Sequence, residues 1–408
     1  MKLYITFNEE VIGELIFEDN QFYLNYYDNW IKNGFELSNY LPFNNTNNEN
    51  IKNFLKNLLP EGENLDDISI FLQISKYNTF GLIQEIGKDI AGAINFYQTF
   101  PKKEKRFIEI DTKILANKIK KIDYENMLVW NGKVRLSIAG VGKKLPVMIK
   151  DDILGFAEGD YASTHILKFD KKELHLVENE YISLKIAQKV GLEVNEVDII
   201  KIEDEKILLV KRFDRFFDEK KDIVIKTHII DGCQFLNIPP EYKYQKVYGE
   251  YSSIEGISIK KLSNHIDKYC TLQEKDKFIN WILFNIIIGN TDAHGKNISF
   301  YVNKKGIYLT PFYDILNTTI YQEFYDTKLS MSIGDNFEIN NLEYSDFIDL
   351  ADDLNVKDNF LINKFKKLLN KFKKEIDFKD KKVDYDFMQK YKQNVLERVE
   401  KFLNILNF

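Results

Sequence analysis

Asp292 and Asn297 are the two residues whose types and spacing are best suited to chemistry. They stand five positions apart in the stretch DAHGKN. Transfer of a phosphoryl group from ATP needs a carboxylate to receive the proton of the acceptor hydroxyl, and an Asn with a second carboxylate to hold Mg²⁺. The D-x-x-x-x-N spacing lets one tight loop present both side chains to one phosphate–metal cluster. Alone, this spacing is more typical of an ordinary turn rich in Asp and Asn.

Asp314 and His294 favour the chemical interpretation of that loop. Asp314 follows Asn297 by seventeen residues and comes after the strand-like residues 306–310, where a kinase has its second Mg²⁺ ligand. His294 could be a core histidine or a metal ligand, but no second His lies within helical or turn reach. We therefore interpret His294 as a phosphate or loop-orienting contact. The apolar run 279–288 predicts a helix that anchors the loop.

Lys168 is the candidate for neutralising the phosphates. The run 165–169 predicts a strand in which Lys168 faces away from its two apolar neighbours. A helix that starts near Glu178 and Glu180 would then supply the strand Lys–helix Glu ion pair of kinases. Two alternatives stay open, because Lys168 could be a solvent-exposed strand residue and Glu180 a first-turn residue favoured by the helix dipole.

Two further segments are candidates for contacts with a nucleotide. Residues 137–144 (SIAGVGKK) predict a loop whose backbone N–H groups could cradle phosphates. This loop is not a Walker A motif, because Ser137 and Lys144 stand where Gly and Ser or Thr are needed. The run 208–215 predicts a strand ending in a polar turn, whose main chain could bind an adenine edge. An ordinary turn and a strand end capped by an Asp–Arg pair are the respective structural alternatives.

The elements that must position these residues fall into three stretches. Short β-rich runs and a helix stopped by Pro60 predict a small α+β domain over residues 1–105, with 102–106 as the linker candidate. Residues 106–230 predict several strands around one helix, which Gly191 can close. Residues 231–408 are predicted to be nearly all helical. This order is that of a bilobal kinase, but many α+β enzymes share it.

Composition and charge limit the class of protein. The 408 residues are 44% hydrophobic and 14% aromatic, which predicts a globular chain. A net charge of −6 argues against a protein that coats nucleic acid. Cys233 and Cys270 form no CxxC pair, the N-terminal residues lack the apolar core of a signal peptide, and the longest apolar run, 281–289, is too short to span a membrane. We therefore expect a cytoplasmic protein.

Seven ordered motifs resemble the HipA family, bacterial serine/threonine kinases that act as toxins of toxin–antitoxin pairs. The matching stretches are SIAGVGKK (137–144), THILK (164–168), NEY (179–181), RFDR (212–215), DGCQ (231–234), TDAHGKNIS (291–299) and LTPFYDI (309–315). Residues 57–61 and 85–93 are similar to signatures of the family's N-terminal subdomain. The resemblance implies a bilobal, protein-kinase-like α+β fold with a β-rich N-lobe, an all-helical C-lobe and an extra small N-terminal subdomain.

The resemblance also implies a role for each matching residue. Asp292 would accept the proton, Asn297 and Asp314 would be Mg²⁺ ligands, and Lys168 would contact the phosphates of ATP. The remaining expected ATP contacts are Ala139, Gly140, Val141, Gly142, Lys143, Lys144, Lys211, Arg212, Phe213, His294, Gly295, Lys296 and Tyr313. Ser137 corresponds to the serine on which family members autophosphorylate. The added charge, close to two negative units, would repel bound ATP and switch the kinase off.

Two positions depart from the family's pattern. Position 211 is Lys where the family usually has Glu, a change that a main-chain adenine contact tolerates. Gly142-Lys143 stands where Gln-Glu is common, which adds positive charge to the phosphate-binding loop.

The resemblance implies partners as well as chemistry. It implies a small helix-turn-helix antitoxin (HipB-like), which would bind operator DNA with the kinase attached. The implied substrate is a protein of translation, an aminoacyl-tRNA synthetase such as glutamyl-tRNA synthetase, and no membrane partner is expected. Two other functions stay open: a small-molecule or lipid kinase with the same catalytic loop, and a non-catalytic binding module.

Overall fold

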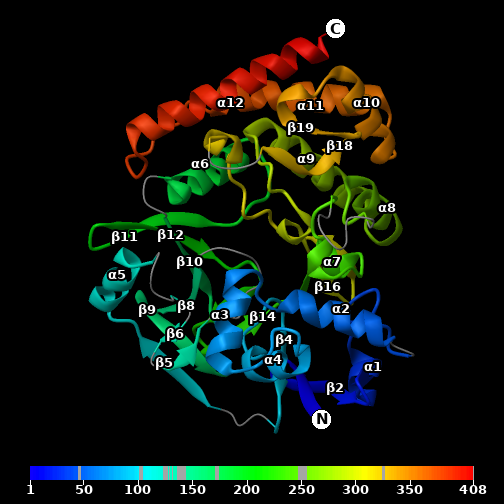
Figure 1. Ribbon diagram of the computed structural model, residues 1–408, viewed down its shortest axis with the longest axis vertical. Coiled ribbons are helices and arrows are strands. Elements are labelled where there is room, and N and C mark those ends of the chain that lie inside the picture. The colour runs from blue at the N-terminus through cyan, green and yellow to red at the C-terminus, as the bar shows by residue number, and fades with distance from the viewer. Residues whose placement is uncertain are drawn as a thin grey trace. The chain divides into compact units, whose positions relative to one another are not determined.

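The computed structural model of the chain describes residues 1–44, 47–100, 104–122, 127, 129–130, 132–135, 144–170, 174–246, 255–323 and 327–407. Contacts divide the chain into two compact units, which we describe separately. Unit 1 comprises residues 1–169, 196–240 and 300–307, and unit 2 comprises residues 170–195, 241–299 and 308–408. Helices and strands are mixed along the chain (Figure 1), so the predicted α+β class is confirmed.

Unit 1 begins with a four-stranded antiparallel sheet of order β3-β2-β1-β4. Its strands are β1 (Lys2–Phe7), β2 (Glu10–Glu18), β3 (Gln21–Tyr26) and β4 (Ile94–Tyr97). The helices between them are α1 (Asp28–Asn33), α2 (Asn48–Leu58), α3 (Glu63–Leu72) and α4 (Thr79–Ile86). Helix α2 begins at a cap, because the side chain of Asn47 accepts a hydrogen bond from the N–H of Glu49. Its buried apolar face contacts β3 and α4.

A second sheet of unit 1 has six strands in the order β11-β12-β10-β8-β9-β5. The strands are β5 (Lys105–Glu109), β8 (Lys144–Lys150), β9 (Ile153–Gly159), β10 (His165–Phe169), β11 (Val197–Ile202) and β12 (Glu205–Lys211), and α5 (Thr112–Lys120) shares their core. Alternation along β10 buries Leu167 and Phe169 and leaves Lys168 half-buried. The predicted orientation of Lys168, away from its apolar neighbours, is therefore confirmed.

Smaller elements include the hairpins β6 (Val129–Trp130)–β7 (Lys133–Val134) and β13 (Arg215–Asp218)–β14 (Ile223–Lys226) and the helix α7 (Gly232–Phe235), all in unit 1. A three-stranded sheet consists of β15 (Ile229–Asp231), β16 (Ser299–Asn303) and β17 (Gly306–Leu309). The short turn η1 (Pro240–Tyr242) lies where unit 1 gives way to unit 2 along the chain. The predicted domains 1–105, 106–230 and 231–408 stay a prediction, because contacts group most of the first two in one unit.

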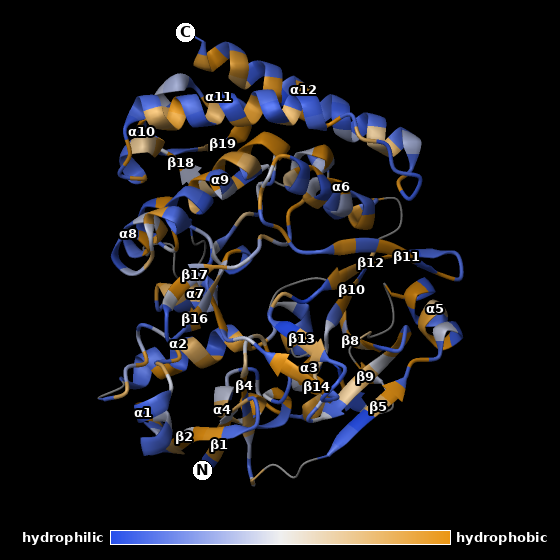
Figure 2. Ribbon diagram, turned by 180° about the vertical axis from the view of Figure 1, so that it is seen from behind, coloured by the Kyte–Doolittle hydropathy of each residue, from blue (hydrophilic) through white to orange (hydrophobic). Residues whose placement is uncertain are grey.

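Unit 2 is mainly helical. Its helices are α6 (Leu176–Lys189), α8 (Ile259–Tyr269), α9 (Leu272–Ile288), α10 (Tyr344–Asp353), α11 (Asp358–Glu375) and α12 (Tyr385–Leu406), with the short turns η3 (Gly295–Asn297), η4 (Thr318–Tyr321) and η5 (Ile339–Asn341). Hydrophobic and hydrophilic residues alternate along α11 and α12 (Figure 2). Both helices contact α9, which is buried from Trp281 to Ile288. No helix in the part of the chain that the structure describes is long and apolar enough to cross a membrane.

The prediction of an all-helical C-terminal region is wrong. Residues after 230 also form β16, the expected strand β17 within 306–310, and the hairpin β18 (Lys328–Ile333)–β19 (Asn336–Glu338). The sequence KLSMSI of β18 does alternate, but its Ser side chains are buried together with its apolar ones, so no polar face marks the strand. The helix predicted over 279–288 and the closure of α6 near Gly191 are both confirmed.

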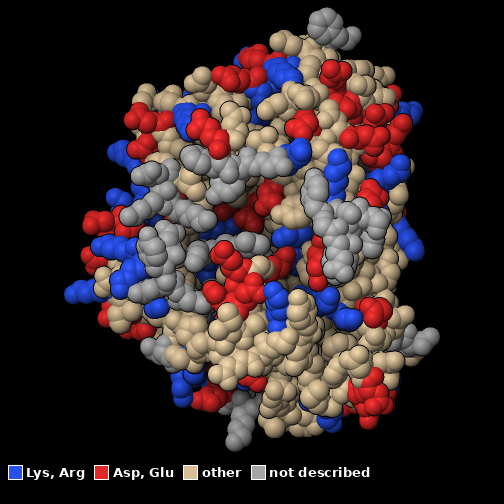
Figure 3. All heavy atoms as spheres, in the orientation of Figure 1, with Lys and Arg blue, Asp and Glu red and all other residues tan. Residues whose placement is uncertain are grey.

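Charged side chains of both signs are interspersed on the face of the molecule drawn in Figure 3. Acidic side chains gather over α10, which contains Asp346, Asp349, Asp352 and Asp353. On this face there is no continuous basic field of the kind that non-specific nucleic-acid binding requires, among the residues that the structure describes.

Candidate active site

The loop that carries Asp292 begins where α9 ends. Helix α9 ends at Gly289, which adopts a left-handed conformation with φ of 79°. A Cβ on Gly289 would lie 2.5 Å from Oγ1 of Thr319 and 2.7 Å from the guanidinium of Arg398. Only glycine combines this backbone conformation with so close an approach. The sharp turn therefore directs the following residues away from the helix axis at a fixed point.

Side chains with amide and hydroxyl groups then hold the loop from both sides. Asn285, inside the last turns of α9, accepts from Nδ2 of Asn290 at 2.8 Å, and Asn290 accepts from the N–H of Asp292 at 3.2 Å. The N–H of Thr291 donates to Oγ1 of Thr318 at 2.7 Å. Asn285, Asn290 and Thr291 are all buried, so these hydrogen bonds are shielded from water and fix the backbone before Asp292.

Asp292 and Asn297 lie together, as their spacing predicted. Asn297 Nδ2 donates to the main-chain oxygen of Asp292 at 2.9 Å. Because that oxygen can only accept, the amide oxygen of Asn297 must point elsewhere, and an amide oxygen is a ligand that Mg²⁺ accepts. Asn297 is buried, whereas Asp292 is exposed and can reach an incoming hydroxyl. The hydroxyl of Tyr244 donates to Oδ1 of Asp292 at 2.9 Å.

The middle of the loop is a short 3₁₀ turn stabilised by His294. Nδ1 of His294 accepts from the N–H of Lys296 at 3.2 Å, and the Tyr244 ring meets the imidazole edge-to-face at 5.1 Å. His294, Gly295 and Lys296 are buried. The prediction that His294 orients the loop is consistent with the Nδ1 contact.

Tyr313 and Asp314 continue the site within unit 2. The hydroxyl of Tyr313 donates to the main-chain oxygen of Lys296 at 2.9 Å and lies 2.6 Å from the hydroxyl of Ser299. Asp314 follows with φ of 57°, a left-handed conformation that is uncommon outside glycine. Such conformations persist where the surroundings impose them, often at functional sites. Tyr313 thus connects the segment that contains Asp314 to the loop of Asp292 and Asn297.

Lys168 and Lys144 form a cross-strand pair in unit 1. The register of β8 and β10 places Lys168 directly opposite Lys144. Directly opposed residues in an antiparallel pair share one face of the sheet, and two like charges there repel each other. The pair therefore places two positive charges on one face of this sheet. The sequence named both lysines but could not predict the register that brings them together.

Main-chain groups of the strand end at Lys211, Arg212 and Phe213 already make hydrogen bonds within the protein. The N–H of Lys211 donates to the carbonyl of Glu196 at 3.0 Å, and the N–H of Arg212 donates to that of Thr164 at 2.9 Å. The carbonyl of Phe213 accepts from the hydroxyl of Tyr301 at 3.2 Å. An adenine contact through either of the first two N–H groups would have to break an internal hydrogen bond.

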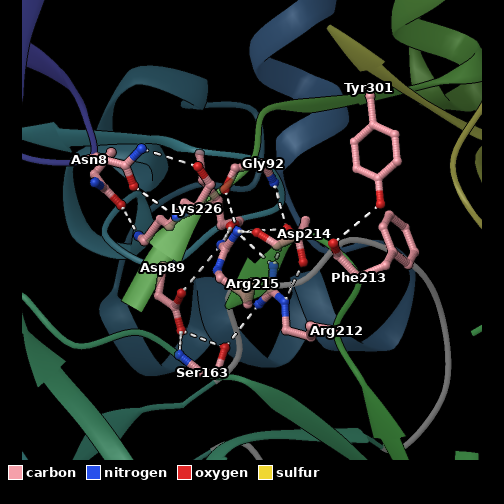
Figure 4. Close-up of polar contacts among 12 residues, drawn as sticks. Asn8, Asp89, Gly92, Ser163, Arg212, Phe213, Asp214, Arg215, Lys226 and Tyr301 are labelled. Carbon is pink, nitrogen blue, oxygen red and sulfur yellow. Dashed lines mark hydrogen bonds and ion pairs between the residues drawn. The ribbon is translucent and has the colours of Figure 1, made fainter. Parts of the chain in front are cut away.

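Arg212, Asp214 and Arg215 form a buried charge network behind this strand end (Figure 4). Asp214 accepts from Nε of Arg212 at 2.9 Å and from Arg215 at 2.7 Å, and also from the N–H of Gly92 at 3.1 Å. Burial alone would raise the pKa of Asp214, but the two arginines outweigh it and hold that pKa at about 2. Burial also disfavours the charged form of Arg215, and it lowers the pKa of this arginine to about 10.

The network also connects the first hundred residues to the second sheet of unit 1. Arg215 donates to the carbonyls of Ile90 and Gly92, each at 2.6 Å, and Arg212 donates to Oγ of Ser163 at 2.9 Å. Asp89 accepts from the same Oγ at 2.7 Å. The segment 85–93 is therefore joined to the strand end at Arg212 by charge-assisted hydrogen bonds.

The remaining predicted site residues differ in whether the structure describes them and in the unit to which they belong. Ser137, Ala139, Gly140, Val141, Gly142 and Lys143 lie outside the described residues. The structure brings Asp292, Asn297, His294, Lys296 and Tyr313 into one hydrogen-bonded group within unit 2. Glu180 is buried in α6, in the same unit. Lys144, Lys168 and the strand end at 211–213 belong to unit 1.

Sequence reasoning missed several residues that support the loop. Asn285, Asn290 and Thr318 hold its backbone, and Arg398 of α12 donates to the carbonyl of Ile287 at 3.2 Å near the end of α9. Asn285 did leave a signal, because it interrupts an otherwise apolar helical run. A polar residue buried in such a run needs a partner, and its partner lies in the loop.

Comparison with known proteins shows the family. The HipA N-terminal domain matches residues 3–97, and the HipA-like C-terminal domain matches residues 136–376. The chain is 38% identical over 343 residues to the serine/threonine-protein kinase toxin HipA of Shewanella oneidensis, a match covering 81% of this chain and 78% of that protein. It is 28% identical over 300 residues to a putative kinase, Y4mE, of Sinorhizobium fredii, covering 71% and 69%.

A solved structure agrees with these sequence matches. Shewanella oneidensis HipA, in a complex with HipB and operator DNA, superposes with a TM-score of 0.90 and 34% identity, over 99% of this chain and 98% of that one. This chain therefore belongs to the HipA family of serine/threonine kinase toxins. The resemblance seen in its motifs is confirmed.

Proposed function

We propose that this protein transfers the γ-phosphoryl group of ATP to a serine or threonine of another protein. The observation that carries the proposal is the loop of Asp292, whose carboxylate is exposed while the backbone on both sides is fixed by buried hydrogen bonds. A rigid loop that presents one accessible carboxylate next to an Asn is what phosphoryl transfer to a hydroxyl requires. Membership of a family whose named relatives are kinases supports the same conclusion.

The residues divide the reaction between them. The acceptor oxygen forms a bond to the γ-phosphorus while the bond to the β–γ bridging oxygen breaks, and ADP leaves. Asp292 receives the proton of the acceptor hydroxyl. Asn297 and Asp314 would hold Mg²⁺, which when bound neutralises charge on the phosphates. Both are oxygen donors, which fits this ion.

The nucleotide contacts remain those that the sequence suggested. Lys168 and Lys144 would contact the phosphates from one face of the second sheet of unit 1. Residues 139–144 would form the phosphate-binding loop, as the resemblance implies. The strand end at 211–213 would meet the adenine edge through main-chain groups other than the N–H groups of Lys211 and Arg212, which already donate within the protein. The Arg212 guanidinium is engaged by Asp214. His294–Lys296 and Tyr313 would complete the ATP site by holding the loop in place.

We further propose regulation in two forms. Phosphorylation of Ser137 would add close to two negative charges to a loop that must approach ATP, and so would switch the enzyme off. A helix-turn-helix antitoxin would be the partner, and the Shewanella oneidensis complex of HipA with HipB and operator DNA supports this. We propose that this chain reaches operator DNA only through such an antitoxin. The proposed substrate is an aminoacyl-tRNA synthetase, such as glutamyl-tRNA synthetase.

We also propose a cytoplasmic location. Cys233 and Cys270 are free thiols, a state typical of a reducing compartment.

Incubation with radiolabelled ATP and Mg²⁺ tests the kinase activity. The purified chain should label itself or a lysate protein, and Asp292→Asn should lower the rate by about 10²- to 10⁴-fold. Asp335, exposed in the β18–β19 turn, supplies a matched control, since Asp335→Asn should leave the rate unchanged. Equal labelling by wild type and Asp292→Asn would refute the proposal. Label in a metabolite pool instead of protein would favour a small-molecule kinase.

A further inference from the structure

Asn179 is a buried polar residue of α6 that begins the motif NEY, and the reaction described above gives it no role. It is 0% exposed, and the helix is buried on either side of it, from Val177 to Leu184. Asn is a poor choice for the middle of a helix, because its side chain competes with the backbone for hydrogen bonds. A buried amide also needs partners, and these partners show what Asn179 holds in place.

The amide of Asn179 pairs with both main-chain groups of Asn317. Its Oδ1 accepts from the N–H of Asn317 at 2.8 Å, and its Nδ2 donates to the carbonyl of Asn317 at 2.9 Å. Nδ2 also donates to the hydroxyl of Tyr321 at 2.9 Å. One side chain thus makes the two hydrogen bonds that opposed residues of neighbouring antiparallel strands exchange. We call the two hydrogen bonds to Asn317 the Asn179 clamp.

The side chain of Asn317 is held from another direction, by α12. Its Nδ2 donates to Oδ1 of Asn394 at 2.9 Å, and its Oδ1 accepts from Oγ1 of Thr319 at 2.8 Å. Asn317 is as fully buried as Asn179, so these hydrogen bonds are shielded from water. Main chain and side chain of Asn317 are therefore fixed by two different helices.

The clamped residue lies between two parts of the site. Asp314 precedes Asn317 by three residues. Thr318 follows Asn317 directly, and its Oγ1 accepts from the N–H of Thr291 at 2.7 Å. Thr291 is the residue before Asp292. A shift of Asn317 would therefore move both the segment of Asp314 and a support of the Asp292 loop.

Asp314 depends on what holds the chain on either side of it. Its φ of 57° is a conformation that persists only where the surroundings impose it. Before Asp314, the N–H of Phe312 donates to the carbonyl of Glu193 at 2.9 Å. After Asp314, the Asn179 clamp fixes the main chain at Asn317.

We propose that Asn179 is a positioning residue, which fixes the segment 314–318 and thereby the place of the Asp314 carboxylate relative to the Asp292 loop. This inference rests on the proposed kinase function, in which Asp314 would hold Mg²⁺. Without the clamp the Asp314 carboxylate is still present, but it is no longer held in one place. Mg²⁺ should then bind more weakly, because residues that orient a metal ligand contribute to the affinity for the metal.

Asn179→Ala tests the proposal through the binding of ATP with and without Mg²⁺, which titration calorimetry measures without any phosphoryl transfer. The Mg²⁺ concentration needed for half of its effect on ATP binding should rise about tenfold. The Kd for ATP alone should not change. Hydrogen exchange without nucleotide gives a second measurement: the amide of Asn317, which Oδ1 of Asn179 protects, should exchange about tenfold faster.

Asn57→Ala is the matched control. Asn57 is a buried residue of α2 in unit 1, and its Nδ2 donates to the carbonyl of Ile238 at 2.8 Å. Both variants should lower the melting temperature, but only Asn179→Ala should change the Mg²⁺ dependence and the exchange at Asn317. If Asn179→Ala does not fold, Asn179→Ser replaces it, because the Ser hydroxyl is too short to pair with both main-chain groups of Asn317.

The outcomes separate the positioning role from the kinase function. The same Mg²⁺ dependence in wild type, Asn179→Ala and Asn57→Ala overturns the positioning role while the kinase function stands. Failure of both Asn179 variants to fold, when Asn57→Ala folds, also overturns it, since Asn179 then serves folding alone. Wild type that binds no ATP in the presence of Mg²⁺ overturns the kinase function itself.

Discussion

Replacement of Asp214 by Asn removes the negative charge at the centre of the buried network in unit 1. The Asp214 carboxylate accepts two hydrogen bonds from Arg212, at 2.9 and 2.8 Å, one from Arg215 at 2.7 Å and one from the N–H of Gly92 at 3.1 Å. All three charged residues are no more than 5% exposed. Asn has the same shape, but it carries no charge and its amide nitrogen cannot accept a hydrogen bond.

The structure sets the size of the expected effect. Removal of one partner from a buried ion pair leaves uncompensated charge behind and costs about 3–5 kcal/mol of stability. Here two arginines would stay buried beside one neutral amide, so the upper part of that range applies. Neighbouring Asp89, whose Oδ1 lies 3.6 Å from Arg215, offsets only part of the loss because the separation is longer. We expect Asp214→Asn to destabilise unit 1 by about 4 kcal/mol.

The pH dependence supplies an independent measure. The pKa of Asp214 is lowered from 3.8 to about 2, so its contribution is fully present above pH 4 and is lost as the pH falls through 2. This difference corresponds to roughly 2 kcal/mol of linkage. The free energy of unfolding of wild type should therefore fall more steeply than that of Asp214→Asn between pH 4 and 2. We expect Asp214→Asn to destabilise unit 1 by more than the acid-induced loss in wild type. Protonation of Asp214 at low pH leaves a carboxyl group in place that still makes hydrogen bonds.

Urea unfolding followed by hydrogen exchange in the segments 85–97 and 205–231 reports on unit 1. Asp222→Asn is the control, since Asp222 also pairs with a base, Lys150, at 2.7 Å, but is 44% exposed. An exposed pair of this kind contributes about 0–1 kcal/mol. If Asp214→Asn costs no more than Asp222→Asn, the buried network does not stabilise unit 1 and the reasoning is refuted.

Three other substitutions test separate parts of the structure. Lys226 is buried, which lowers its pKa to about 7. The free energy of unfolding of wild type should therefore rise between pH 7 and 10 by roughly 1 kcal/mol per pH unit. In urea unfolding, the stability of Lys226→Met should not change over that pH range. Gly289→Ala should cost about 1–3 kcal/mol of stability and slow phosphoryl transfer, because the left-handed turn before Asp292 would be strained; full activity would contradict this. Arg398→Met should lower the melting temperature and the rate together, whereas Lys401→Met on the same helix should change neither.

Local patterns in the sequence predicted much of the framework around the site. The strand β10 matches its predicted bounds, 165–169, because alternation acts over a few neighbours. The helix before the Asp292 loop was predicted from the run 279–288, although α9 starts earlier, at Leu272. Its first turns are polar and depend on the cap at Thr271, whose side chain accepts from the N–H of Glu274.

Features that depend on tertiary pairing could not be predicted in this way. The opposition of Lys168 and Lys144 follows from the register of β8 and β10, which no local pattern specifies. The contact of Asn290 with Asn285 joins a loop to the helix before it. Asn285 interrupts an apolar run, but no local pattern shows that its partner is Asn290. The D-x-x-x-x-N spacing placed Asp292 and Asn297 together because they lie in one loop. Residues that support the loop come from distant parts of the sequence: Arg398, which contacts the end of α9, lies 111 positions after Ile287.

The strand end at Arg212 shows how a structural and a functional interpretation of one segment can both hold. The sequence offered two alternatives for residues 208–215, an adenine-binding edge and a strand end capped by an Asp–Arg pair. The buried Asp214–Arg215 contact at 2.7 Å confirms the second. That cap also fixes the position of the main chain at residues 211–213, since Arg212 and Arg215 are held to segment 85–93 from behind. A main-chain contact is selective only where the backbone cannot move, so the charge network is a condition for the proposed adenine site and not a rival to it.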